Sequence, residues 1–186
     1  MEKQQSNLIS NFFAINDFSK AENGNYRVKG LLTTFDNPEA NLNGYLYKAG
    51  CYDTFLKSYY QSNGKNIPLD ILHNVTDLAH LVGKVTEFNV TKNEAQIVAE
   101  VSRYAIHFNS IVGLIEDGVL QGFSDMSFVN NGKYLDNGML EVSECSLFSV
   151  ALVQNPAVVA SKLQLANATK FNFIEEEIPH NTLFNL

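Results

Sequence analysis

The chain lacks tryptophan, and it is poor in cysteine, proline and basic residues. Its two cysteines, Cys51 and Cys145, lie far apart and form no Cys-x-x-Cys spacing. A zinc site of that kind and a disulfide framework are therefore not expected, and reduced thiols in a cytoplasmic setting are predicted. Thirteen Lys and Arg against 20 Asp and Glu give a formal net charge of −7. That balance disfavours a basic surface for nucleic acid.

Long apolar runs are also missing. No stretch approaches the roughly 18 apolar residues of a membrane-spanning helix, and residues 1–13 contain no apolar core of the length that a signal peptide needs. Neither a membrane partner nor export is expected from the sequence.

What the sequence does contain fits one globular domain. It has 186 residues, of which 45% are hydrophobic, and its eight tyrosines and thirteen phenylalanines favour strands. We expect residues 1–24 to form an N-terminal arm or a first edge strand, and residues 25–165 to form a single domain. Residues 166–186, which include the acidic run Glu175–Glu177, are expected to be a weakly ordered tail.

Hydrophobic periodicity and turn residues place the elements. Helices are predicted over 52–60, 104–116 and 157–165, and Asn130–Gly132 and Asp136–Gly138 are predicted as turns. Strands are predicted over 25–35, 44–47, 67–72, 82–90, 94–101, 119–129 and 139–153. Strands joined by turns, with helices inserted singly, predict a mainly β, α+β fold. The expected form is a closed, antiparallel-rich β-barrel with two or three peripheral helices.

Three stretches carry the candidate chemistry. The apolar run Ile67–Leu72 ends on His73, where a polar turn begins, and an imidazole there could take and return a proton near neutral pH. The second stretch, Gly122–Val129, contains Ser124 and Ser127. The third, Leu147–Ala157, closes the series with a strand and a Pro-Ala pair.

In this order, the motifs IPLDILHN, VGKVTEF, MSFV and LVQNPA resemble the caudovirus prohead serine protease family, the capsid-maturation proteases of tailed bacteriophages. YRVKGLLTTFDNP and GYLYKAGCYDTFL resemble the family's opening strand and the segment before its first helix. The resemblance covers roughly residues 25–161. Each motif is short and loose, so the specificity lies in the series.

The resemblance implies a fold related to herpesvirus assemblin and a serine endopeptidase that uses neither a metal nor a cofactor. Such an enzyme would act inside the immature capsid, the prohead, in the host cytoplasm. Its partners would be the phage scaffold protein and the major capsid protein, both of them substrates. Self-cleavage and a homo-oligomeric state are left open.

The resemblance assigns the general base to His73. His80 is the rival, while His107 and His180 are interpreted as structural or exposed. For the nucleophile, the match of MSF favours Ser127 and the match of GVLQGFS favours Ser124, so we expect Ser127 with Ser124 as the alternative. Because these serines are three residues apart, a regular strand points them to opposite faces, and only one can meet His73.

The third catalytic position departs from the family, because Ser149 stands where the resemblance places an acid. A hydroxyl can hold the imidazole tautomer, but it cannot supply charge to an imidazolium, so a slower enzyme is expected. Glu144 is the nearest acid upstream. Its odd offset from Ser149 puts it on the other face of the strand unless a bulge intervenes.

Two other functions fit the same residues. One is a catalytically impaired member of the family that acts as a scaffold or assembly factor, which the serine at position 149 favours. The other is a β-barrel module that binds peptide or carbohydrate, in which case the series of motifs is accidental.

Overall fold

A computed structural model describes residues 8–38, 43–62 and 66–154. The predicted helix over 157–165, the tail 166–186 and His180 lie outside the described residues.

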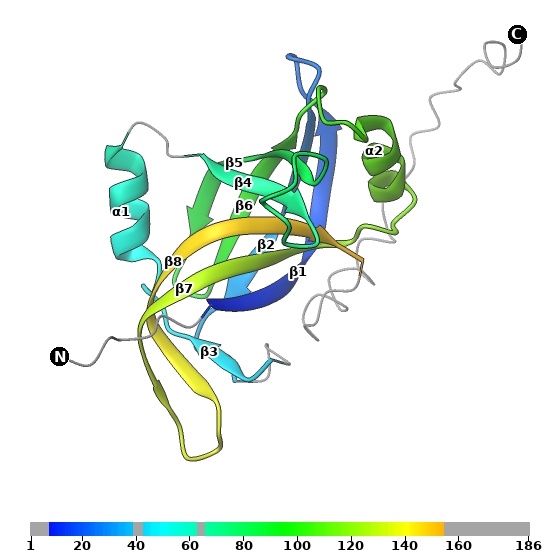
Figure 1. Ribbon diagram of the computed structural model, residues 1–186. Helices are drawn as coiled ribbons and strands as arrows, with labels where there is room; N and C mark the ends of the chain where they lie inside the picture. Colours follow the sequence, from blue (N-terminus) through cyan, green and yellow to red (C-terminus); the bar gives the residue numbers. More distant parts are fainter. Residues whose placement is uncertain (1–7, 39–42, 63–65, 155–186) are drawn as a thin grey trace, which may run out of the picture.

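The described chain is mainly β, with eight strands and two helices at the periphery (Figure 1). The helices are α1 (Asp53–Gln61) and α2 (Phe108–Glu116). The strands are β1 (Leu8–Lys20), β2 (Tyr26–Thr34), β3 (Tyr45–Tyr47), β4 (Ile67–Ile71), β5 (Leu81–Val90), β6 (Glu94–Val101), β7 (Gly122–Tyr134) and β8 (Leu140–Val153).

The strands form one mixed sheet in the order β3-β8-β4-β5-β6-β2-β1-β7, and β7 also pairs with β8. Six of its eight strand pairings are antiparallel, as predicted, but the sheet does not support the predicted closed barrel. Both β3 and β4 run parallel to β8, and β3 lies beyond β8 at an end of the strand order. Strands joined by short turns pair antiparallel, whereas the long, helix-containing connections from β3 and β4 to β8 allow parallel pairing. The sheet curls on itself without forming the predicted barrel (Figure 1).

The predicted hairpin of residues 82–101 is confirmed as β5 and β6, with Thr91–Asn93 as its turn. Gly83 explains how closely the two strands approach. A Cβ atom added at Gly83 would lie 1.8 Å from the carbonyl oxygen of Glu100, so no larger residue fits without moving the backbone.

Three segments differ from their predictions. The segment expected as an N-terminal arm contains β1, which pairs with β2 on one side and β7 on the other and is therefore an interior strand. Helix α2 begins at Phe108 rather than at residue 104. The turn predicted at Asn130–Gly132 is part of β7, where register shifts absorb the turn-forming residues. The chain reverses at Asp136–Gly138, the other turn predicted in this region.

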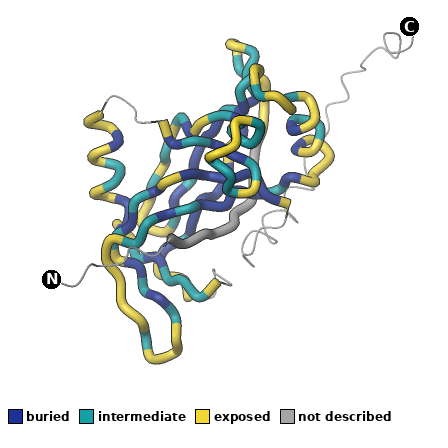
Figure 2. The backbone as a smooth tube through the Cα atoms, viewed as in Figure 1, coloured by how far each residue is buried: buried dark blue, intermediate teal, exposed yellow. Residues whose placement is uncertain are grey.

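The core lies on the inner face of the curled sheet (Figure 2). Side chains that alternate along the strands fill it, including Val28, Leu69, Val85, Phe123 and Leu152, each at most 1% exposed. Both helices contribute apolar side chains to this core, α1 through Tyr59 and α2 through Ile111 and Ile115.

Candidate active site

His73 meets Ser124. Strand β4 ends at Ile71, and the next two residues, Leu72 and His73, adopt left-handed backbone conformations with φ of 61° and 56°. This turn leaves His73 half-buried, with its Nε2 atom 2.5 Å from the Ser124 hydroxyl oxygen. Consecutive left-handed residues other than glycine are strained, at a cost of about 1–3 kcal/mol each, so the surrounding structure must hold this turn in place.

The strand register explains why Ser124 is available to the imidazole. On β7, Ser124 pairs with Ala151 of β8, and Ala151 pairs on its other side with Asp70 of β4. Directly paired residues direct their side chains to the same face of a sheet. Ser124 and Asp70 therefore flank Ala151 on one face, and the small alanine side chain leaves space between them.

The structure does not bring Ser127 to His73. The Ser127 hydroxyl donates a hydrogen bond to Asp125 Oδ2 at 2.7 Å, and the Tyr52 hydroxyl reaches the same oxygen at 3.2 Å. Phe123, Asp125 and Ser127 alternate with Ser124 along β7, so this polar cluster belongs to the opposite, inner face. Of the two serines that the sequence offered, the geometry pairs Ser124 with the histidine.

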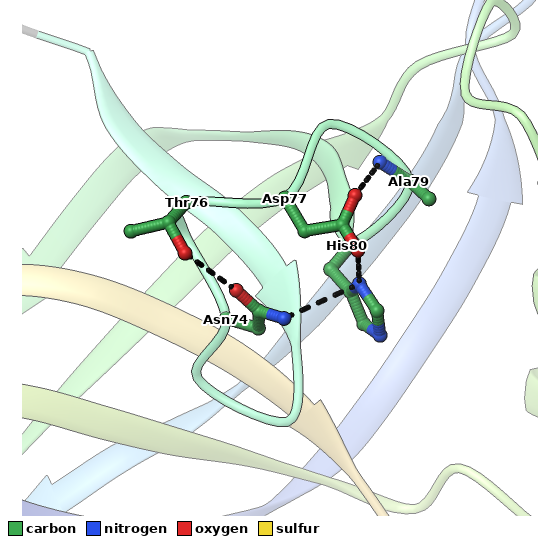
Figure 3. A network of polar contacts seen from close by, with 5 residues as sticks. All are labelled: Asn74, Thr76, Asp77, Ala79 and His80. Atoms are coloured by element: carbon green, nitrogen blue, oxygen red, sulfur yellow. Dashed lines mark hydrogen bonds and ion pairs between the residues drawn. The ribbon is translucent and has the colours of Figure 1, made fainter.

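The rival His80 is held in a different network. Its Nδ1 atom lies 3.0 Å from Asp77 Oδ2 and 3.5 Å from the side-chain nitrogen of Asn74 (Figure 3). The Asp77 carboxylate also accepts the backbone N–H of Ala79 at 2.9 Å. These contacts brace the loop that follows His73. His107 lies immediately before α2 and lines the same pocket as His80 and Leu72.

Asp70, which the sequence interpretation passed over, lies beside the pair and is fully buried. Burial raises the pKa of its carboxyl to about 6, while the Ser149 hydroxyl and the backbone N–H groups of His73 and Asn74 oppose the rise. These donors face the carboxylate outside the usual geometry of a formed hydrogen bond. A carboxyl inside the apolar run Ile67–Leu72 was the signal available in the sequence, because a buried aspartate is rare without a reason.

The two residues considered for the third catalytic position have different surroundings. Ser149 is buried beside the carboxylate of Asp70. Glu144 pairs with Asn131 of β7. It precedes Ser149 by five residues on β8, which at the usual rise of a strand places it roughly 16 Å from Ser149. A register shift does occur between Leu147 and Ser149, but the structure does not bring Glu144 to His73.

The electrostatics suit proton transfer at His73. Burial lowers the pKa of the imidazole below its ordinary value of 6.5, so the neutral ring, which can accept a proton, predominates at neutral pH. In the tautomer that accepts at Nε2, the ring can receive the hydrogen of Ser124. Chemically, this arrangement can activate a hydroxyl for attack on a carbonyl carbon.

An apolar pocket of about 330 Å³ lies beside the end of β4, where Ile71 and Leu72 line it. Leu72, the neighbour of His73, and Val153, two residues beyond Ala151 on β8, form part of its wall. The rest of its lining comes chiefly from α2 and the segments before and after it, including His107, Ile111, Leu114 and Leu120.

The described residues contain no group of three or more His, Cys, Asp or Glu side chains placed to hold a metal ion. Neither described helix has the length and apolar character needed to span a membrane.

The curled mixed sheet, with a histidine loop over one face, defines a fold similar to that of a phage capsid assembly protease. Among the solved structures that match is the bacteriophage T4 capsid assembly protease, gp21, with a TM-score of 0.65 and 14% sequence identity. The match covers 82% of this chain and 100% of that one. No family model matches the chain, and no curated protein matches its sequence.

Proposed function

We propose that this protein is a serine endopeptidase in which Ser124 is the nucleophile and His73 the general base. The observation that carries the proposal is the 2.5 Å contact between His73 Nε2 and the Ser124 hydroxyl on a fold of the capsid-protease kind. In the reaction, Ser124 attacks the scissile carbonyl as His73 takes its proton. His73 then returns that proton to the departing amine, and water hydrolyses the acyl-enzyme by the same route.

The substrates that fit this proposal are the proteins of an assembling phage head. We propose that the enzyme works inside the prohead in the host cytoplasm and cuts the scaffold protein, the major capsid protein or both. The pocket beside Leu72 would receive an apolar side chain of the bound polypeptide, since its walls offer leucine, isoleucine and valine.

Co-expression tests the proposal directly. The wild-type chain is expressed with the scaffold and major capsid proteins of its phage, and intact masses are measured. We expect one of these proteins to be shortened, and we expect Ser124→Ala and His73→Ala to leave it whole. Ser127→Ala is the matched control and is expected to preserve cleavage. Cleavage that survives Ser124→Ala would overturn the assignment of the nucleophile.

A second candidate is an assembly factor that does not hydrolyse. The burial of Ser124, which is 0% exposed, favours it, because a substrate cannot contact a hydroxyl that is closed off from the surface. Intact scaffold and capsid proteins in every co-expression, together with binding of the chain to either one, would support this candidate over the peptidase.

A further inference from the structure

Asp70 is an ionisable group for which the proposed chemistry leaves no role. It is 0% exposed, although a carboxylate without firm partners is costly to bury. A leucine or valine would fit the apolar pattern of β4 better. A charged residue at a buried position where the strand pattern favours an apolar one indicates that function, rather than the fold, requires it.

Apart from the Ser149 hydroxyl of β8, the donor groups that face the Asp70 carboxylate belong to the His73 turn. Asp70 lies three residues before His73, and its carboxylate faces the backbone N–H groups of His73 and Asn74. Those N–H groups belong to the segment where Leu72 and His73 adopt left-handed conformations. Successive backbone N–H groups in such turns form a concavity suited to an anion. The carboxylate thus favours the strained turn that aims the imidazole at Ser124.

The position of Asp70 on the sheet supports the same role. Asp70 and Ser124 flank Ala151 from opposite sides, so the imidazole stands on the face that carries both side chains. The hydroxyl of Ser149 approaches the carboxylate from β8. Negative charge in this position would also stabilise the imidazolium that forms when His73 takes the proton of Ser124.

We propose that Asp70 is a positioning residue that fixes the His73 turn through the backbone of His73 and Asn74 and supplies the negative charge beside the imidazole. The inference rests on the proposed function of the His73–Ser124 pair. It assigns the task of the acid to β4, the strand next to the one that carries Ser149.

The test compares Asp70→Asn with wild type in the full chain, using the second-order rate of labelling by a fluorophosphonate from pH 5 to 9. Asn keeps the shape of the side chain and removes its charge. We expect labelling at pH 7.5 to slow by about 10²-fold, as for a misplaced catalytic group. Asp136→Asn is the matched control. It removes the same charge at an exposed residue of the turn between β7 and β8, outside the loop that follows His73, and we expect less than a threefold change.

The shape of the pH profile separates positioning from general support of the fold. His80 is the titratable group whose charge acts on Asp70, and the His73 ring lies on the same face of the sheet. The paired neighbours of Asp70 on β8 and β5, Ala151 and Leu81, and the nearby Ser149 do not titrate in this range. In wild type, labelling requires an ionised Asp70 and a neutral His73, so its acid limb should be steeper than one proton allows. In Asp70→Asn the slope of the acid limb should fall to that of one proton, because His73 is then the only one of these two required groups that titrates.

An NMR titration of the His73 ring in Ser124→Ala, with and without Asp70→Asn, needs no catalysis. We expect Asp70→Asn to shift the ring resonances and to lower the pKa of His73, since a nearby negative charge is lost. Unchanged ring resonances and an unchanged labelling slope in a folded Asp70→Asn would overturn the inference. If wild type is not labelled but the ring resonances move, the peptidase proposal fails and the inference about Asp70 stands.

Discussion

Replacing Asp70 by asparagine is expected to stabilise the protein at neutral pH even as it slows the chemistry at Ser124. The pKa of this buried carboxyl is about 6 in the folded state, against an ordinary value of 3.8. The folded protein therefore holds this proton more tightly than the unfolded chain does. The stability that Asp70 provides when protonated is fully present below pH 3.8 and is lost as the pH rises through 6.

The magnitude follows from the same two values. Ionising Asp70 in the folded protein lowers the free energy of unfolding by about 1 kcal/mol near pH 4.5 and by about 3 kcal/mol at pH 7. Asn carries no such cost, so the advantage of Asp70→Asn over wild type should grow by about 2 kcal/mol between these pH values. Urea unfolding of both proteins across this range measures the difference, and titrations elsewhere in the chain cancel.

A constant difference between the two proteins from pH 4.5 to 7 would refute this reasoning, because Asp70 would then titrate alike in the folded and unfolded states. A variant that is more stable yet labels more slowly would show that the buried charge is kept for function rather than for the fold.

Three further changes test other parts of the structure. Ser127→Ala should lower the free energy of unfolding in urea by about 1–3 kcal/mol, because buried Asp125 loses a hydrogen-bond donor. Fluorophosphonate labelling should continue, and its loss in a folded protein would contradict the placement of Ser127 on the inner face. Gly83→Ala should lower the free energy of unfolding by about 3 kcal/mol or more in the same assay, since the added Cβ would meet the Glu100 carbonyl oxygen. Gly113→Ala is the control and should cause no loss, because its added Cβ meets nothing within 4 Å. Equal effects at the two glycines would argue against the close approach of β5 and β6. Leu72→Gly should raise stability by about 1 kcal/mol in thermal unfolding, because φ is 61° and the side chain is 70% exposed; Leu78→Gly, at a similarly exposed leucine that is not in the left-handed region, should give no gain.

Local patterns predicted the elements well and their closure poorly. The β5–β6 hairpin, the β2 strand and α1 follow from alternation, turn residues and helical spacing, all of which are local. The parallel pairing of β4 with β8 joins segments about 80 residues apart and leaves no mark in either one. The interior position of Leu8–Lys20, for which the sequence offered an arm or an edge strand, was likewise hidden, because it depends on β2 and β7 flanking it on both sides.

The candidate site was predictable in outline. A histidine at the end of an apolar strand and a serine in the stretch Gly122–Val129 are the residue types that the structure brings together. Choosing between Ser124 and Ser127 required the face of β7 that His73 meets, which the register of β7 with β8 sets. Asp70 is marked in the sequence only as a carboxyl inside an apolar run, because its role depends on the left-handed turn at Leu72 and His73 and on burial beside Ser149.

The most direct test of the central claim is to locate the adduct after exposure of the full chain to a fluorophosphonate, by intact mass followed by peptide mapping. We expect one adduct, on Ser124, which is absent in His73→Ala and retained in Ser127→Ala. An adduct on Ser127, or one on Ser124 that forms equally fast without the His73 imidazole, would contradict the account.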